Sequence, residues 1–167
     1  MLSTALRHRH PGPAPSREDG RGPTAVVATT PSDSHSWNLV FLQLLLEELG
    51  YTVHNLGPCL PTEDLVAGCR EHRPDLLVLS SVNGHGLIEA PDAARAVRGA
   101  GLTDLHAVVG GKLTTDGTLD PGQYRALLAA GFDAVFTPER SALEFAEHLR
   151  SLQAPQDQRE LAEGAVR

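Results

Sequence analysis

The sequence is poor in cysteine, lysine and aromatic residues, and each shortage narrows the class of protein. Its two cysteines, Cys59 and Cys69, are too few for a disulfide framework or a zinc ribbon in a chain of 167 residues. We therefore expect reduced structural thiols and a cytoplasmic protein. Lys112 is the only lysine, and aromatic residues make up 4% of the chain, so we expect an aliphatic core.

The sequence also lacks an excess of basic residues and a long apolar run. Its formal net charge of -7 argues against a nucleic-acid-binding face. The longest apolar stretch, residues 39–49, is interrupted by Gln43 and by Glu47 and Glu48, so no membrane span is predicted. No G-x-G-x-x-G motif follows the first predicted strand and no phosphate loop is present, which argues against a dinucleotide site.

Short β-branched stretches alternate with helix-like stretches along most of the chain. The pattern predicts five strands, at residues 24–29, 52–56, 76–80, 106–109 and 134–137, and five helices, at residues 38–49, 62–71, 91–100, 123–130 and 141–152. Because each strand is followed by a helix, we expect a doubly wound α/β fold with a five-stranded parallel sheet, flavodoxin-like or Rossmann-like, and helices on both faces. We assign residues 23–152 to one domain, residues 1–22 to a disordered extension and residues 153–167 to a polar tail.

Small and polar residues gather in three loops that follow predicted strands. Asp33 and His35 follow the first strand, residues 80–86 (Ser-Ser-Val-Asn-Gly-His-Gly) follow the third, and Gly110 and Gly111 follow the fourth. In open α/β sheets, ligands bind at the carboxyl ends of the strands. Glycines there allow close approach of the backbone, and small side chains leave room for a broad planar ligand.

These three loops together resemble the cobalamin-binding domain family, whose pattern is D-x-H-x-x-G, then S-x-L, then G-G. Residues 33–35 (Asp-Ser-His) match the first motif, residues 80–82 (Ser-Ser-Val) match the second with Val for Leu, and Gly110-Gly111 match the third. The resemblance covers about residues 24–150. One position departs from the pattern, because Asn38 stands where a glycine is expected. Asparagine tolerates unusual backbone angles and is suited to capping the predicted helix.

The resemblance implies a role for each of these residues. His35 would be the lower axial ligand of cobalt, displacing the cofactor's own benzimidazole, and Asp33 would hold the other ring nitrogen. The displaced nucleotide tail would slide between the first and third strands, near Ser80 and the paired glycines. The expected cofactor contacts are Asp33, Ser34, His35, Ser36, Ser80, Val82, Asn83, Gly84, Gly110 and Gly111, with His35 as the metal ligand and no catalytic residue in this chain alone.

Within that family, residues 80–86 and 108–112 look most like the small (sigma) subunit of glutamate mutase. That resemblance implies an adenosylcobalamin-dependent mutase that interconverts L-glutamate and threo-3-methyl-L-aspartate. The substrate would lie in a separate TIM-barrel subunit, in a heterotetramer of two small and two large chains, and this chain would be inactive alone. The cofactor would supply the difficult chemistry.

Two other interpretations remain open from the sequence. One is a stand-alone corrinoid carrier or sensor, although we recognise neither the helical domain of methyl carriers nor a DNA-binding or signalling domain. The other is a flavodoxin-like domain that has lost cofactor binding, which the Asn38 departure from the family pattern would suggest.

We expect His85 to be an exposed loop side chain, while Trp37 is either buried at the helix start or placed beside the corrin. The remaining histidines show no metal-ligand spacing.

Overall fold

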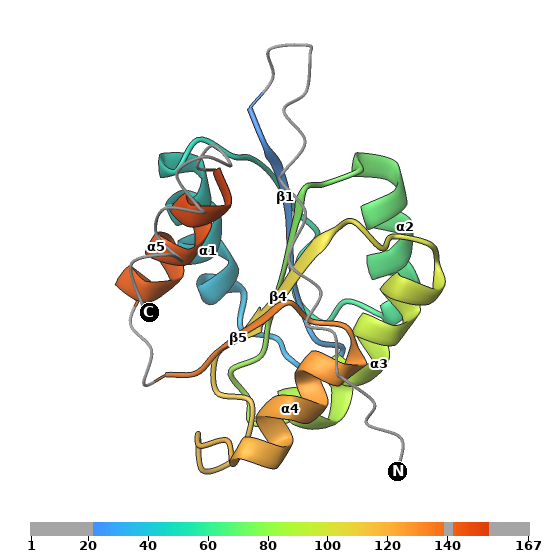
Figure 1. Cartoon of the computed structure of the whole chain (residues 1–167), viewed down its shortest axis with the longest axis vertical. Coiled ribbons are helices and arrows are strands. Elements are labelled where there is room, and N and C mark those ends of the chain that lie inside the picture. The colour runs from blue at the N-terminus through green and yellow to red at the C-terminus, as the bar shows by residue number, and fades with distance from the viewer. Residues whose placement is uncertain (1–21, 139–141, 154–167) are drawn as a thin grey trace, which may run out of the picture.

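The computed structural model describes residues 22–138 and 142–153, which form a single parallel sheet covered by helices on both sides (Figure 1). The strand order is β2-β1-β3-β4-β5, as the doubly wound prediction requires. The strands are β1 (Thr24–Thr29), β2 (Thr52–Asn55), β3 (Leu76–Ser80), β4 (His106–Gly110) and β5 (Ala134–Phe136). The helices are α1 (Ser36–Glu48), α2 (Thr62–His72), α3 (Gly86–Gly99), α4 (Pro121–Ala130) and α5 (Ala142–Gln153).

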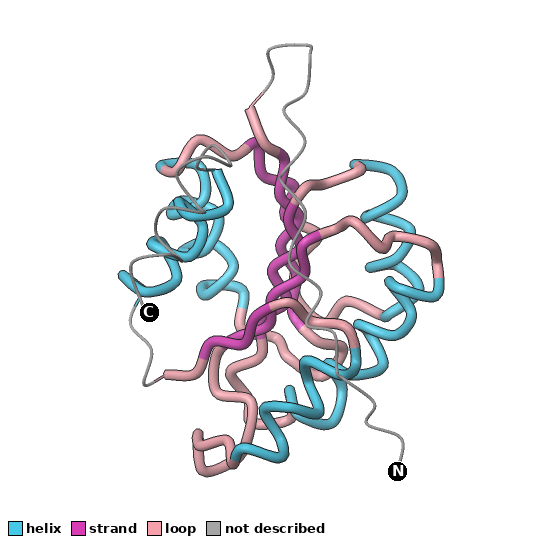
Figure 2. Tube along the Cα trace, viewed as in Figure 1, coloured by secondary structure: helices cyan, strands magenta, loops and turns pink. Residues whose placement is uncertain are grey.

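The central strands are buried on both faces of the sheet, which explains their continuous apolar sequences. Alternate residues point to opposite sides. Val26 and Leu77 pack with α2, α3 and α4, whereas Val27 and Val78 pack on the side of α1 and α5. Figure 2 shows the two helical layers on either side of the strands. The core is mostly aliphatic, as predicted, and its aromatic members are Tyr51, Phe132 and Phe145.

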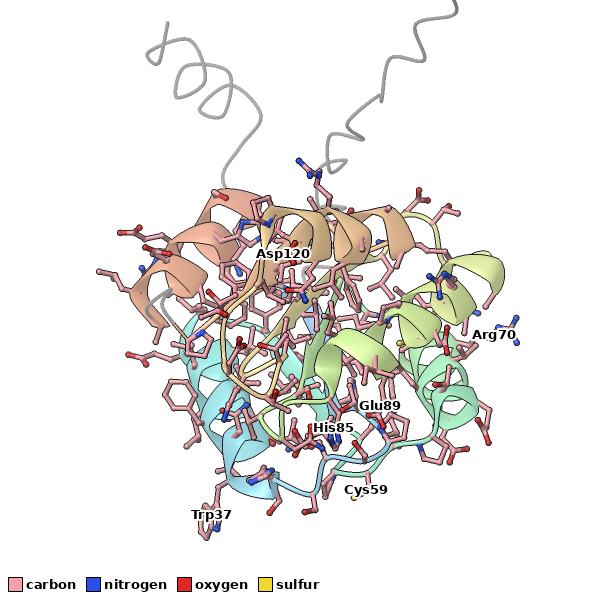
Figure 3. The ribbon with its side chains drawn as sticks, turned by 90° about the horizontal axis from the view of Figure 1, so that it is seen from below. Trp37, Cys59, Arg70, His85, Glu89 and Asp120 are labelled. Carbon is pink, nitrogen blue, oxygen red and sulfur yellow. The ribbon has the colours of Figure 1, made fainter. Side chains whose placement is uncertain are left out.

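The register of the sheet brings the ends of three strands to one edge. Thr29 at the end of β1 lies opposite Ser80 of β3, and Ser80 lies opposite Gly110 of β4. The loops that follow these strands therefore meet at the carboxyl edge, as expected from parallel pairing. Figure 3 is viewed onto this edge, with Trp37, Cys59 and His85 lying along it.

Three helices begin earlier than the sequence predicted, and α4 does so by two residues, at Pro121 rather than at residue 123. Helix α1 begins at Ser36 rather than at residue 38, and helix α3 begins at Gly86 rather than at residue 91, so Pro91 lies inside the helix. Gly86 packs closely against Ser81, so that a side chain in place of the glycine would put its Cβ atom 2.7 Å from Cβ of Ser81. The N–H of the next residue, Leu87, donates to the carbonyl of Leu113. This anchoring sets the start of α3, although the proline removes one helical hydrogen bond.

The predictions for the two ends of the chain fall mostly outside the described residues, and the domain boundaries stay predictions. Gln153 is an exception, because it belongs to α5 and its amide donates to the carbonyl of Leu49. None of the described helices is long and apolar enough to cross a membrane. Cys69 is buried and Cys59 is exposed, and neither forms a disulfide.

Candidate functional site

Asp33 is the buried centre of the loop that follows β1. Its side chain is 0% exposed. One carboxylate oxygen accepts the backbone N–H of His35 at 2.9 Å and lies 2.7 Å from the His35 ring nitrogen Nδ1. The other accepts the backbone N–H groups of Val82 at 2.5 Å and of Asn83 at 3.3 Å. A single side chain therefore ties the loop after β1 to the loop after β3.

These hydrogen bonds keep the Asp33 carboxyl ionised despite its burial. Burial acts to raise the pKa of Asp33, but the N–H groups of Val82 and His35 and the His35 ring outweigh it, so the pKa lies below its ordinary value. A buried carboxylate that accepts several N–H bonds is a fixed negative charge. It therefore favours a proton on the Nδ1 atom of His35.

His35 presents its other ring nitrogen to the outside of the molecule. With the proton on Nδ1, the neutral imidazole carries its lone pair on Nε2. The side chain is 57% exposed, and Nε2 accepts no hydrogen bond from the described residues. Among the residues that the structure describes, no group of three or more His, Cys, Asp or Glu side chains is placed to hold a metal ion. In this arrangement His35 could contribute one nitrogen ligand to a metal, and its role as the metal ligand stays a prediction.

A cavity of about 310 Å³ lies beside this loop, between the sheet and the helices α1 and α5. It is lined by the ends of β3, β4 and β5, by α1 and by the start of α5. The sequence predicted a route between the first and third strands, and this was wrong, because β1 and β3 are hydrogen-bonded neighbours along five residue pairs. The space lies on one face of the sheet instead.

Four of the predicted contact residues line this cavity: Ser80, Val82, Gly110 and Gly111. A Cβ atom at Gly110 would lie 3.0 Å from the carbonyl oxygen of Phe136. Gly111 has φ +110°, and a Cβ atom there would overlap the carbonyl oxygen of Ser81. The packing of the loop therefore requires glycine at 111, and Gly110 leaves little room for a side chain between β4 and Phe136. The two glycines also leave bare backbone as part of the cavity wall.

The other six predicted contact residues, Asp33 and His35 among them, lie outside the lining, and their contact with a ligand stays a prediction. The Asn83 amide donates to the carbonyl oxygen of Ser32 at 3.0 Å and to its hydroxyl at 2.9 Å, which joins the two loops. Gly84 adopts φ +89° in the tight turn after β3. Ser34 and Ser36 are exposed on either side of His35.

The sequence did not identify several residues that line the cavity. Asn38 lies in the first turn of α1, where its amide donates to the Ser80 hydroxyl at 2.5 Å rather than capping the helix. Three aromatic side chains also line the cavity: Phe41, Phe136 and Phe145. No local pattern indicates that Asn38 contacts Ser80, and residues 136 and 145 come together only in the fold.

Trp37 and His85, which the sequence singled out, do not line the cavity. Trp37 is 84% exposed at the carboxyl edge, so it is not part of the core, and His85 is exposed as predicted (Figure 3). Away from this edge, the ring nitrogen Nε2 of His106 lies 3.0 Å from Nε2 of His148. His54 and His72 stack with ring centroids 3.8 Å apart. These pairs are structural contacts that sequence spacing did not indicate.

Comparisons with known proteins agree with this geometry. A family model described as "B12 binding domain" matches residues 23–146. The chain is 32% identical to the glutamate mutase sigma subunit of Halobacterium salinarum over 117 residues, which is 70% of this chain and 78% of that protein. It is 33% identical to the sigma subunit of Carboxydothermus hydrogenoformans over 114 residues, which is 68% of this chain and 82% of that protein.

Solved structures show the same fold. A cobalamin-binding protein from Desulfitobacterium hafniense superposes with a TM-score of 0.60 at 24% identity, over 78% of this chain and 58% of that one. A response regulator from Thermotoga maritima superposes equally well, with a TM-score of 0.60 at 15% identity, over 80% and 99% of the two chains. Because proteins of different function share this architecture, the fold alone does not identify the ligand.

Proposed function

The chain belongs to the B12-binding domain family, and from this membership we propose that it is the cofactor-binding subunit of an adenosylcobalamin-dependent carbon-skeleton mutase. Its relatedness to glutamate mutase sigma subunits favours the interconversion of L-glutamate and threo-3-methyl-L-aspartate. The observation that carries the proposal is the buried Asp33 carboxylate, which holds His35 with Nε2 directed outward at the carboxyl edge.

The residues present fit a corrinoid. A neutral imidazole nitrogen is a suitable ligand for cobalt, and a carboxylate on the opposite ring nitrogen fixes the tautomer and makes the ligand more electron-rich. Beside it lies a largely apolar cavity whose wall includes the bare backbone of Gly110 and Gly111 and the hydroxyl of Ser80. This cavity would hold the nucleotide tail after His35 has displaced the benzimidazole.

Each part of the chain then has a defined task. His35 would supply a ligand to the metal, and Asp33 would keep the proton on Nδ1 so that Nε2 stays free to bind it. The apolar side chains of the cavity would keep water from the nucleotide tail, and the Ser80 hydroxyl would be available to the base of that tail. When bound, adenosylcobalamin supplies the radical chemistry, which the protein's own side chains do not provide.

The proposal also requires a second chain to hold the substrate. The named relatives are subunits, and two large apolar side chains stand exposed in the first turns of the helices that follow β1 and β3: Trp37 in α1, and Ile88, 75% exposed, in α3. Apolar side chains beside a binding edge mark a surface for a partner. We propose a large TIM-barrel subunit there, in a cytoplasmic heterotetramer of two small and two large chains.

The test is reconstitution. The purified chain, titrated with adenosylcobalamin, should bind it with the visible spectrum of a corrinoid whose own base has left cobalt. Addition of a glutamate mutase large subunit should then give conversion of L-glutamate to 3-methylaspartate. Turnover by this chain alone, or no binding of any corrinoid, would contradict the proposal. Binding without turnover alongside any large subunit would instead favour a stand-alone carrier or sensor.

A further inference from the structure

The hydrogen bond between Asn38 and Ser80 joins helix α1 to the end of strand β3. The Asn38 amide nitrogen lies 2.5 Å from the Ser80 hydroxyl oxygen, and both side chains line the cavity. Asn38 is half-buried and Ser80 is buried. The contact therefore closes the space between helix and sheet at this point.

The strand order places this hydrogen bond on the side of the cavity that faces His35. His35 follows β1, whereas the cavity extends over the neighbouring strands β3, β4 and β5. Ser80 belongs to the first of these strands and lies opposite Thr29 of β1. Asn38 and Ser80 are therefore the lining residues that a group reaching from a metal on His35 into the cavity would meet at its near end.

We propose that Asn38 determines which corrinoids this chain accepts, by narrowing the entrance to the cavity through its hydrogen bond to Ser80. A full nucleotide tail has to displace the Asn38 amide from Ser80, whereas a corrinoid without a nucleotide leaves the bond intact. Asn38 should therefore weaken the binding of corrinoids that carry a full nucleotide tail and leave the binding of tail-less corrinoids unaffected. This inference rests on the proposed function, because it takes His35 as the cobalt ligand.

Two probes separate the effect of the tail from that of the corrin ring. We would titrate the full chain with cobinamide, which has no nucleotide, and with hydroxocobalamin, which has one, and measure both dissociation constants by visible absorbance and equilibrium dialysis. Asn38→Gly should tighten hydroxocobalamin binding about tenfold, which corresponds to one hydrogen bond that no longer has to be broken. Cobinamide binding should change less than about twofold, since its complex leaves the entrance empty.

Control variants keep the test decisive. Asn38→Ala removes the amide but retains helix propensity, and should shift selectivity in the same direction if Asn38→Gly fails to fold. Gln43→Ala removes an amide from the same helix that does not line the cavity, and should leave both constants unchanged. Weaker hydroxocobalamin binding in the Asn38 variants, or equal changes in the dissociation constants of both probes, would overturn this inference but not the proposed function. Failure of the unaltered chain to bind either probe would overturn the proposed function with it.

Discussion

The carboxylate of Asp33 lies 2.7 Å from Nδ1 of His35, and this contact makes the orientation of the imidazole depend on a buried charge. The same carboxylate accepts the N–H of Val82 from the loop after β3. A residue that orients the proposed metal ligand therefore also joins two loops of the scaffold. Its loss should affect stability and ligation together.

Replacing the Asp33 charge should destabilise the chain even without a cofactor. Asp33→Asn keeps the size of the side chain but removes an acceptor for two charge-assisted bonds, and we expect a loss of about 2–3 kcal/mol in the free energy of unfolding. Urea denaturation followed by circular dichroism would measure it. Asp92→Asn, at an exposed ion pair in α3, is the matched control and should change little.

The stabilisation by Asp33 should also depend on pH. Because its pKa is lowered by folding from 3.8, the folded state binds fewer protons at acidic pH than the unfolded state. The contribution is therefore present above about pH 4 and is lost as the pH falls through the lower folded-state pKa. The difference in stability between the unaltered chain and Asp33→Asn should shrink on acidification below about pH 4, and a constant difference would contradict this assignment.

Removing the imidazole of His35 should abolish the spectroscopic signal of a histidine nitrogen bound to cobalt while leaving the fold intact. His35→Ala should weaken corrinoid binding by more than the roughly 10–100-fold expected from loss of an outer partner. With nitrogen-15-labelled histidine, the coupling to reduced cobalt in the electron paramagnetic resonance spectrum should disappear. His85→Ala is the control, because His85 is also exposed at this edge (Figure 3). A labelled-nitrogen signal that persists in His35→Ala would place the ligand elsewhere.

Substitution by alanine should change the stability of the chain in opposite directions at Gly111 and at Gly99, because the space around these two glycines differs. Gly111→Ala forces a left-handed backbone on alanine and a clash with the Ser81 carbonyl, so we expect a loss of about 1–3 kcal/mol in unfolding free energy. Gly99, at the end of α3, has open space around its missing Cβ. Gly99→Ala should be neutral or stabilise by up to about 1 kcal/mol. Thermal denaturation of the two variants gives the comparison, and a harmless Gly111→Ala would show that the Ser81 carbonyl moves away easily.

Trp37 offers a direct binding signal because it is the only tryptophan and is exposed near His35. Corrinoids absorb in the near-ultraviolet region where tryptophan emits, so binding at His35 should quench the fluorescence. The quenching should saturate with the same dissociation constant as the visible absorbance change. It should be lost in His35→Ala. Binding without quenching would indicate a site far from the start of α1.

The two cysteines should differ sharply in reactivity. Cys59 is exposed, whereas burial removes Cys69 from solvent and raises the pKa of its thiol to about 11. Because the thiolate is the reactive form, a thiol reagent near neutral pH should modify one residue in the folded chain and both in denaturant. Peptide mass spectrometry should locate the first modification at Cys59. Rapid labelling of both thiols in the folded chain would show that the core around Cys69 opens readily.

Much of the fold could be predicted because local patterns carry the necessary information. β1, β3 and α2 have sequences whose apolar runs, proline and glycine signals match their observed positions within a residue. The start of α3 could not be predicted, because Gly86 is held by contacts with Ser81 and Leu113. Pro91, the strongest local start signal, was overridden by that packing.

The sequence by itself determined the parallel sheet and the three loops at its carboxyl edge, because alternating strands and helices leave few topologies and the loop motifs are contiguous. It also placed Asp33 two residues from His35, close enough for one to orient the other. Only the tertiary structure decided that the cavity lies on the face covered by α1 and α5. It alone paired Asn38 with Ser80, 42 positions away, because that contact depends on how α1 packs against β3 and not on any local pattern.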